Sequence, residues 1–340
     1  MRPWIPRASR FMSPLGRMLS NRAKQAIGFA RRHRRLTLTA TMAFLSVLYG
    51  VTCFLMVQSL TSVDRKPQED NPAKHGLAYE DVTFRSRDGL SLSGWYIPGA
   101  PNAPGIIFVP GFDSNRSGDH AVDIADRLVH QGFGALLFDL RGQGSSATTS
   151  ASGGWFERFD VLGAFNYLKS RGLPASRIGV LGLSMGAASA VFAAAEEPGI
   201  SALALDSPYA NVTSLIADET ARRTFIPRWV APIFIPTARI MARVADGIDL
   251  GKMAPEQAIK KVPYPVLVMQ GSTDTRIPLA HGQAVYRAAA PGSQLWVVDG
   301  AGHVDEFALR PDEYIQRLMT YYNERLAGKT AAAHATEAVR

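Results

Sequence analysis

The stretch that decides the fold is residues 178–186, which read Ile178-Gly179-Val180-Leu181-Gly182-Leu183-Ser184-Met185-Gly186. Its first six residues are apolar or small, which is typical of a strand buried on both faces. A run of small residues, 187–195, follows at helical length. The two glycines that flank Ser184 permit a turn too tight for side chains, and the strained turn lifts the serine hydroxyl above the sheet. Strand, turn and helix together predict a nucleophilic serine.

Other short apolar runs alternate with helical patterns on both sides of this stretch. The runs predict strands at 106–109, 135–140, 178–183, 202–205, 266–269 and 295–298, and the patterns predict helices at 119–130, 156–170, 184–196 and 312–326. Upstream, residues 79–86 and 90–97 alternate apolar and polar across an Asp-Gly turn, which predicts an antiparallel edge hairpin. The expected fold class is therefore α/β, with a mostly parallel central sheet and helices on both faces.

A serine hydroxyl needs a base to remove its proton and a carboxylate to orient that base. His303 follows the strand predicted at 295–298, and Asp274 follows the one at 266–269, each in a glycine-containing loop. Parallel strands end at one edge of a sheet, so Ser184, Asp274 and His303 are expected to meet there as a catalytic triad. Asp206, which follows the strand at 202–205, is the alternative acid.

Residues 78–327 resemble the α/β-hydrolase superfamily. The match is carried by the serine turn, the loops of Asp274 and His303, and two further segments, Gly111-Phe112-Asp113-Ser114-Asn115-Arg116 and Asp139-Leu140-Arg141-Gly142-Gln143-Gly144-Ser145. More narrowly, the chain resembles membrane-anchored α/β-hydrolase-domain proteins and prolyl-oligopeptidase-like hydrolases. The resemblance implies an oxyanion hole built from the backbone N–H groups of Phe112 and Met185. One departure is Pro110, which stands where the family often has His.

The N-terminal part of the chain predicts a membrane anchor. Residues 1–35 hold ten Lys and Arg and no Asp or Glu, which predicts a basic cytoplasmic tail. Residues 36–60 carry no charge and would form a helix of about 37 Å, enough to span a hydrocarbon core of about 30 Å. The positive-inside rule then predicts a single-pass protein with residues 61–340 outside the cytoplasm, in the periplasm of a Gram-negative cell. A buried core helix, a cleaved signal peptide and a twin-arginine export signal at Arg34-Arg35 are the other interpretations.

Three further segments complete the predicted organisation. Residues 61–77 are polar and contain two prolines, which favours an extended tether. Residues 207–260 exceed what a simple crossover needs, which predicts a lid insertion. The lid's Trp229, Ile233 and Phe234 are expected over the substrate, either packed onto the core or mixed with arginines as an interfacial segment. Residues 328–340 are expected to be a disordered tail.

These features predict a serine hydrolase for a carboxylic ester or thioester, with a small-molecule or lipid-like substrate. A peptidase or amidase with the same triad is the first alternative, and a non-catalytic binding protein is the second. Without the first 35 residues the chain has 27 basic and 29 acidic residues, so nucleic acid is not expected as a partner. No metal-ligand spacing or phosphate loop is present, so neither a metal nor a cofactor is expected. The oligomeric state stays open.

Overall fold

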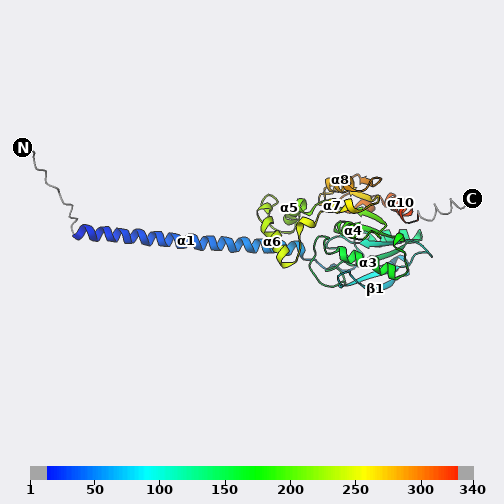
Figure 1. The fold of residues 1–340 in the computed structure, drawn as a ribbon, viewed down its shortest axis with the longest axis horizontal. Helices are drawn as coiled ribbons and strands as arrows, with labels where there is room; N and C mark the ends of the chain where they lie inside the picture. Colours follow the sequence, from blue (N-terminus) through cyan, green and yellow to red (C-terminus); the bar gives the residue numbers. More distant parts are fainter. Residues whose placement is uncertain (1–13, 328–340) are drawn as a thin grey trace, which may run out of the picture. The chain divides into compact units, whose positions relative to one another are not determined.

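The computed structural model describes residues 14–327, which divide into two compact units (Figure 1). The first unit ends at Phe54 and the second begins at Leu55. Residues 1–13, which belong to the predicted basic tail, and residues 328–340, the predicted disordered tail, lie outside the described residues.

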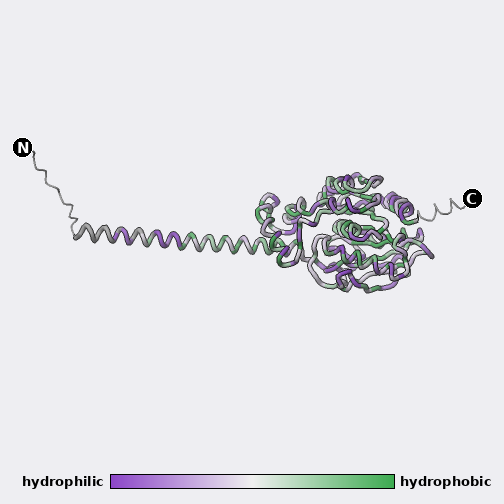
Figure 2. The backbone as a smooth tube through the Cα atoms, viewed as in Figure 1, coloured by the Kyte–Doolittle hydropathy of each residue, from purple (hydrophilic) through white to green (hydrophobic). Residues whose placement is uncertain are grey.

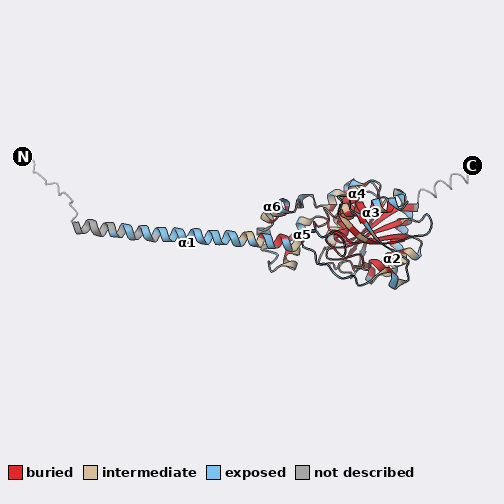
Figure 3. Ribbon diagram, turned by 90° about the horizontal axis from the view of Figure 1, so that it is seen from below, coloured by how far each residue is buried: buried red, intermediate tan, exposed pale blue. Residues whose placement is uncertain are grey.

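Helix α1 (Pro14–Thr61) forms the described part of the first unit and contributes its last turns to the second. Within residues 14–327, one helical segment, Arg31–Thr61, is long and apolar enough to cross a membrane, a test that a signal sequence or a buried soluble helix also passes. Large apolar side chains of this segment are exposed, and the helix is drawn mostly in pale blue in Figure 3. This exposure is unlike that of a core helix, whose side chains would be buried.

The second unit is built on an eight-stranded sheet in the order β1-β2-β4-β3-β5-β6-β7-β8. The strands are β1 (Glu80–Arg85), β2 (Ser91–Ile97), β3 (Gly105–Val109), β4 (Gly134–Phe138), β5 (Ile178–Leu183), β6 (Ala202–Asp206), β7 (Leu267–Gly271) and β8 (Gln294–Val298). β2 is antiparallel to both of its neighbours, and the remaining pairs are parallel. The predicted mostly parallel sheet and its antiparallel edge hairpin are confirmed.

Helices cover both faces of this sheet, which is buried red in Figure 3. The main ones are α2 (Ala121–His130), α3 (Arg158–Ser170), α4 (Met185–Glu196), α8 (Leu279–Ala288) and α10 (Pro311–Tyr322). α3, α4 and α8 pack into one apolar cluster, while α2 and α10 pack into the cluster on the other face. α4 is the most central of them and is strongly hydrophobic in Figure 2. Two packed layers of helix therefore hold the sheet and the serine turn between β5 and α4.

The predicted tether is docked on the second unit. Residues 62–71 form neither helix nor strand, and a short 3-10 helix, η1 (Pro72–His75), follows them. The guanidinium group of Arg65 donates hydrogen bonds to the carbonyl oxygens of Gly144 and Ser146, while the Asn115 side-chain amide donates to backbone carbonyls of the tether. The segment is held on the domain by polar contacts that no hydrophobic pattern reveals.

The lid insertion between β6 and β7 consists of short helices. Its elements are α5 (Val212–Arg223), η3 (Ala231–Ile233), α6 (Ile235–Ala245), η4 (Leu250–Lys252), α7 (Pro255–Ala258) and η5 (Ile259–Lys261). Pro232 and Pro236 each stand at the start of a helical segment, where the missing N–H costs nothing. The final turns of α1, at Met56 and Val57, pack against α5 and α6 in one apolar cluster. The end of the helix is therefore part of the folded domain.

Candidate active site

The turn between β5 and α4 has the strained geometry that the sequence predicts. Ser184 has φ +54° and ψ −117°, a backbone conformation that non-glycine residues rarely adopt. A Cβ atom on Gly182 would lie 2.6 Å from the Cα atom of Ala187, and one on Gly186 would lie 2.5 Å from the carbonyl oxygen of Pro110. Only glycine fits at either position, so the turn can close as tightly as it does.

Ser184, His303 and Asp274 form one chain of hydrogen bonds. The Ser184 Oγ atom lies 2.8 Å from His303 Nε2, and His303 Nδ1 lies 2.8 Å from Asp274 Oδ2. With the ring proton on Nδ1, the imidazole donates to the carboxylate and accepts the serine hydroxyl. The three residues come from loops after β5, β7 and β8, as expected from their places at strand ends. This arrangement can transfer the serine proton to the ring.

The carboxylate of Asp274 is fixed by three other donors. The backbone N–H groups of Arg276 and Ile277 donate to Oδ1, and the Gln270 amide donates to Oδ2 at 3.1 Å. Gln270 is fully buried near the end of β7 and was missed by the sequence analysis. The sequence does show a polar residue directly after an otherwise apolar strand. Because a buried amide is almost always hydrogen-bonded, that position could have been identified as one that fixes a neighbouring polar group.

The loop that follows β3 lies against the serine. A Cβ on Gly111 would lie 3.4 Å from the Cβ of Ser184, and both Phe112 and Met185 line the same cavity as Ser184. The structure thus brings the two predicted oxyanion residues to the serine. Gln143 is fully buried and donates its amide to the Gly111 carbonyl oxygen at 3.0 Å, which holds the loop in place.

Arg223 of the lid joins the oxyanion loop to the end of α1. Its guanidinium group pairs with the Asp113 carboxylate, lies 4.2 Å above the Phe112 ring and donates to the Ser59 carbonyl oxygen at 2.8 Å. The sequence shows Arg223 only as one of several lid arginines. Its contacts could not be predicted because Asp113 and Ser59 are more than a hundred residues away.

Ser184 opens onto a predominantly apolar cavity of about 930 Å³, a volume that includes its open mouth. Its apolar walls come from three sources: the last turns of α1 (Val57, Leu60), the lid (Val212, Leu215, Ile216, Ala238, Ala242, Ile248, Leu250, Met253) and the loops of the core (Phe112, Met185, Tyr209, Ile277). Among the lining residues, three carry charges, namely Glu219, Arg223 and Arg276. Such a cavity favours an apolar ligand with few polar groups.

The three lid residues singled out by the sequence are not among the residues that line this cavity. Trp229 and Ile233 are 80% and 61% exposed, whereas Phe234 packs partly buried in the cluster that contains Met56. The insertion contributes smaller side chains, such as Ala238 and Ala242, to the cavity that Ser184 also lines. Periodicity identified the lid as amphipathic and gave no means of deciding which side faces the core.

Asp206, the alternative acid, bonds to Tyr314, whereas the His303 ring bonds to Asp274. Its Oδ2 atom accepts from the Tyr314 hydroxyl at 2.8 Å, while Ser207 Oγ lies 3.1 Å from Glu306. Burial and the neighbouring Glu306 carboxylate raise the pKa of Asp206 well above its usual value, and burial also raises the pKa of Glu306. Two like carboxyls in a buried site share a proton. Asp206 therefore has a structural hydrogen-bonding role beneath the His303 loop.

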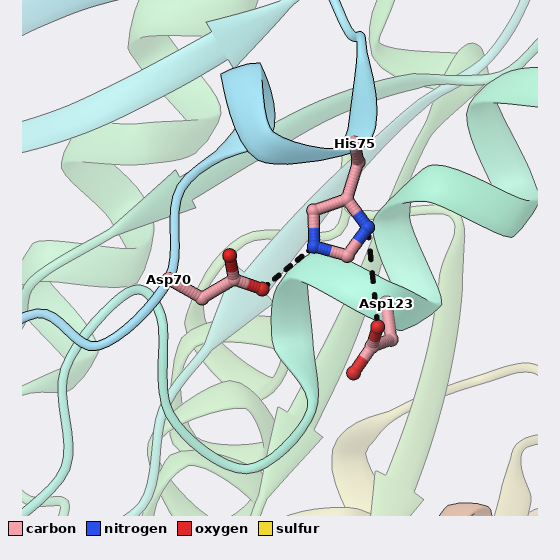
Figure 4. A group of neighbouring side chains, drawn as sticks. All are labelled: Asp70, His75 and Asp123. Carbon is pink, nitrogen blue, oxygen red and sulfur yellow. Dashed lines mark hydrogen bonds and ion pairs between the residues drawn. The ribbon is translucent and has the colours of Figure 1, made fainter.

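A second group, Asp70, His75 and Asp123, offers three metal-ligand atoms within 4.8 Å of one another (Figure 4). His75 Nε2 is already hydrogen-bonded to Asp70 at 2.7 Å, and its Nδ1 lies 4.0 Å from Asp123. The hydrogen bond to Asp70 raises the pKa of His75, which favours the protonated ring between the two carboxylates. We interpret the group as an ion-pair contact between the tether and α2.

The carboxyl pair leads to a prediction about pH and stability. Because the folded state binds the Asp206 proton more tightly than the unfolded chain, its contribution is complete below about pH 4 and falls as pH rises toward the raised pKa. The Asp206→Asn variant keeps an N–H donor for Glu306 but no longer has a carboxyl group that titrates at position 206. We expect the variant to lose less Tm than the wild type between pH 5 and pH 9, as measured by circular dichroism. Glu324→Gln, at an exposed site, is the control, and equal pH profiles for Asp206→Asn and wild type would contradict the shared proton.

Comparison with known proteins agrees with the fold. The model of the Alpha/beta hydrolase family matches residues 106–317. The chain is 28% identical to the uncharacterized protein Rv2307c of Mycobacterium tuberculosis over 280 residues, 81% of this chain and 90% of that one. It is also 28% identical to lysophosphatidylserine lipase ABHD12 of Rattus norvegicus over 67% of this chain and 60% of the lipase.

Among solved structures, the chain is similar to the Pyrococcus furiosus esterase Pf2001, with a TM-score of 0.64 and 24% sequence identity. The match covers 78% of this chain and 99% of the esterase. This likeness supports the fold, and the family match spans more than half of the chain and contains Ser184, Asp274 and His303. The protein is a member of the α/β hydrolase family.

Proposed function

We propose that this protein is a membrane-anchored serine hydrolase that cleaves a carboxylic ester or thioester with an apolar acyl tail. The observation that carries the proposal is the chain of two 2.8 Å contacts from Ser184 through His303 to Asp274, which opens onto an apolar cavity. A buried serine hydroxyl next to an oriented imidazole is the arrangement that acyl transfer requires.

In the proposed reaction, the Ser184 Oγ atom attacks the carbonyl carbon while its proton passes to His303 Nε2. The negative charge on the carbonyl oxygen is stabilised by the N–H groups of Phe112 and Met185, helped by the positive N-terminal end of α4. The tetrahedral intermediate collapses as His303 protonates the leaving alcohol or thiol. A water then attacks the acyl-enzyme with His303 as the base, and Asp274 stabilises the imidazolium in both halves.

The acyl tail is proposed from the walls of the cavity. Most lining side chains are aliphatic or aromatic, and the charged Arg223 and Glu219 both have partners of opposite charge. Two similar proteins support the substrate class, since one is named a lysophosphatidylserine lipase and the other an esterase. Each methylene that enters the cavity contributes up to about 0.8 kcal/mol, so four more carbons could raise kcat/KM by roughly a hundredfold.

The anchor is proposed to be α1. The second unit begins at Leu55, so residues 36–54 are left as the span, and about 19 helical residues measure about 28 Å, close to the thickness of a hydrocarbon core. The basic residues before Leu36 favour a cytoplasmic N-terminus and a catalytic domain on the other side.

Reporter fusions test this orientation. An alkaline phosphatase fused to the C-terminus of the full chain should be active, because that enzyme folds with its disulfides only outside the cytoplasm. Activity confined to a reporter that works in the cytoplasm would reverse the proposed orientation.

Replacement of the nucleophile is the direct test of the activity. Ser184→Ala should lower kcat for p-nitrophenyl butyrate by several orders of magnitude, because residues of a triad act as a unit. Its Tm should match that of the wild type, since a methyl group fits where CH₂OH stood. Ordinary turnover by the folded variant would reject Ser184 as the nucleophile.

The acid is tested by a matched pair of substitutions. Asp274→Asn should be severely impaired because the amide disturbs the tautomer of His303, whereas Asp206→Asn should keep most activity. A larger loss in Asp206→Asn than in Asp274→Asn would assign the acid to β6 instead of β7.

Chain-length preference tests the acyl cavity. Val57 is 6% exposed and lines the cavity, so Val57→Trp should reduce kcat/KM for the decanoate ester far more than for the acetate ester. The matched control is Val297→Trp on the edge strand β8, where the side chain is 39% exposed and does not line the cavity. A wild-type enzyme whose kcat/KM falls steadily beyond butyrate would be a short-chain esterase.

A further inference from the structure

The outer surface of the lid carries five large apolar side chains in contact with solvent. They are Phe225, Trp229, Ile233, Ile240 and Val244, with exposed fractions of 61% to 84%, and we call them the lid face. Soluble proteins expose single apolar residues freely, but several large ones within twenty residues of sequence mark a surface that another phase or molecule covers.

Helix α6 exposes two large apolar residues, Ile240 and Val244, on its outer side. Ala238 and Ala242 are buried against the end of α1, whereas Ile240 and Val244 point to solvent four residues apart. A helix at a protein–water boundary normally buries its bulkier apolar side chains and exposes polar ones. The inner side carries Ala238 and Ala242 together with the partly buried Ile235 and Met241. The outer side carries Ile240 and Val244 together with Arg239 and Arg243, so burial in the domain does not account for Ile240 and Val244.

The charge of this surface identifies what could cover it. Residues 224–245 contain Arg228, Arg239 and Arg243 and no Asp or Glu, so the stretch is basic throughout. All three arginines are exposed; Arg228 is paired with Asp218, so Arg239 and Arg243 are the arginines left to meet an anionic partner. Basic residues interleaved with Trp, Phe and aliphatic side chains match the boundary between anionic headgroups and acyl chains. A second copy of the chain would bring arginines against arginines across a two-fold axis.

The chain enters the second unit beside the lid. The second unit begins at Leu55, and its first residues, Met56, Val57 and Leu60, pack against Ala238, Ala242 and Ile216 of the lid. The polypeptide therefore enters the domain directly beside the lid, from the apolar segment proposed to span the membrane. Figure 1 shows α5 and α6 at one end of the second unit and α10 at the other.

We propose that the lid face binds the surface of the anionic bilayer in which α1 is anchored, with its apolar side chains in the headgroup region and its arginines on lipid phosphates. The inference rests on the proposed anchor and is independent of the chemistry at Ser184. It gives the cavity a mouth at the membrane, where a lipid-like ester is concentrated.

Spin-label accessibility in the full chain tests the proposal. In nanodiscs with anionic lipid, nitroxides are attached at Phe225→Cys and Val244→Cys in a Cys53→Ser background, since Cys53 is the single native cysteine. Gln316→Cys, on the exposed side of α10, is the control. Lid labels should collide more often with oxygen than with a water-soluble nickel complex, and the control should show the reverse order.

The other outcomes overturn the proposal. Lid labels as open to the nickel complex as the control would mean that the lid face is in water, and labels shielded from both reagents would mean a protein contact. The double variant Arg239→Glu/Arg243→Glu should make the lid labels more accessible to the nickel complex, and so should nanodiscs of neutral lipid. Equal accessibility in the double variant, in neutral nanodiscs and in the original anionic nanodiscs would contradict the proposed contact between the arginines and lipid phosphates. The readout requires no turnover, so an inactive enzyme would leave this test intact.

Discussion

The position of the Ser184 hydroxyl depends on one steric constraint: the backbone packs so closely around Gly182 and Gly186 that no side chain fits at either residue. β5 ends and α4 begins within one residue, and the turn closes only because Gly182 and Gly186 bring backbone close to backbone. Ser184 is thereby held at φ +54° with its hydroxyl directed away from the sheet. Such strain persists only when surrounding packing fixes it, and here the buried β5 and α4 supply that packing.

Buried polar side chains then position the loops around the serine. Gln270 holds the Asp274 carboxylate and Gln143 holds the Gly111 carbonyl, and both amides are fully buried. A buried N–H group without a partner costs about 1–3 kcal/mol, so each loop has a strong preference for the conformation that accepts from the Nε2 group of its glutamine. Arg223 adds the lid and the end of α1 to the same network through Asp113 and Ser59. The end of α1 thus contributes to the shape of the site.

Much of this could be predicted from sequence because the decisive signals are local. Short apolar strands, glycines around Ser184 and loops directly after strands carry Asp274 and His303 to one edge of the sheet, and the fold class is confirmed. The docking of the tether, the partners of Arg223 and the small side chains that line the cavity depend on contacts between distant residues. Lid orientation was also open, because an amphipathic pattern does not tell whether its apolar side meets protein or lipid.

The same limit applies to the boundary of the anchor. Hydropathy continues unbroken through Leu60, yet the last turns of α1 pack into the lid and line the cavity. A soluble form that starts at residue 62 would lack Val57 and Leu60 and with them one wall of the site. A form that starts at Leu55 keeps the whole second unit.

The central claim is that Ser184 is activated by His303. A fluorophosphonate probe reacts only with an activated serine, and mass spectrometry of the labelled full chain locates the adduct. The account predicts one adduct, on Ser184, that disappears in a folded His303→Ala variant. A folded wild-type protein that stays unlabelled, or that is labelled at another residue, would contradict it.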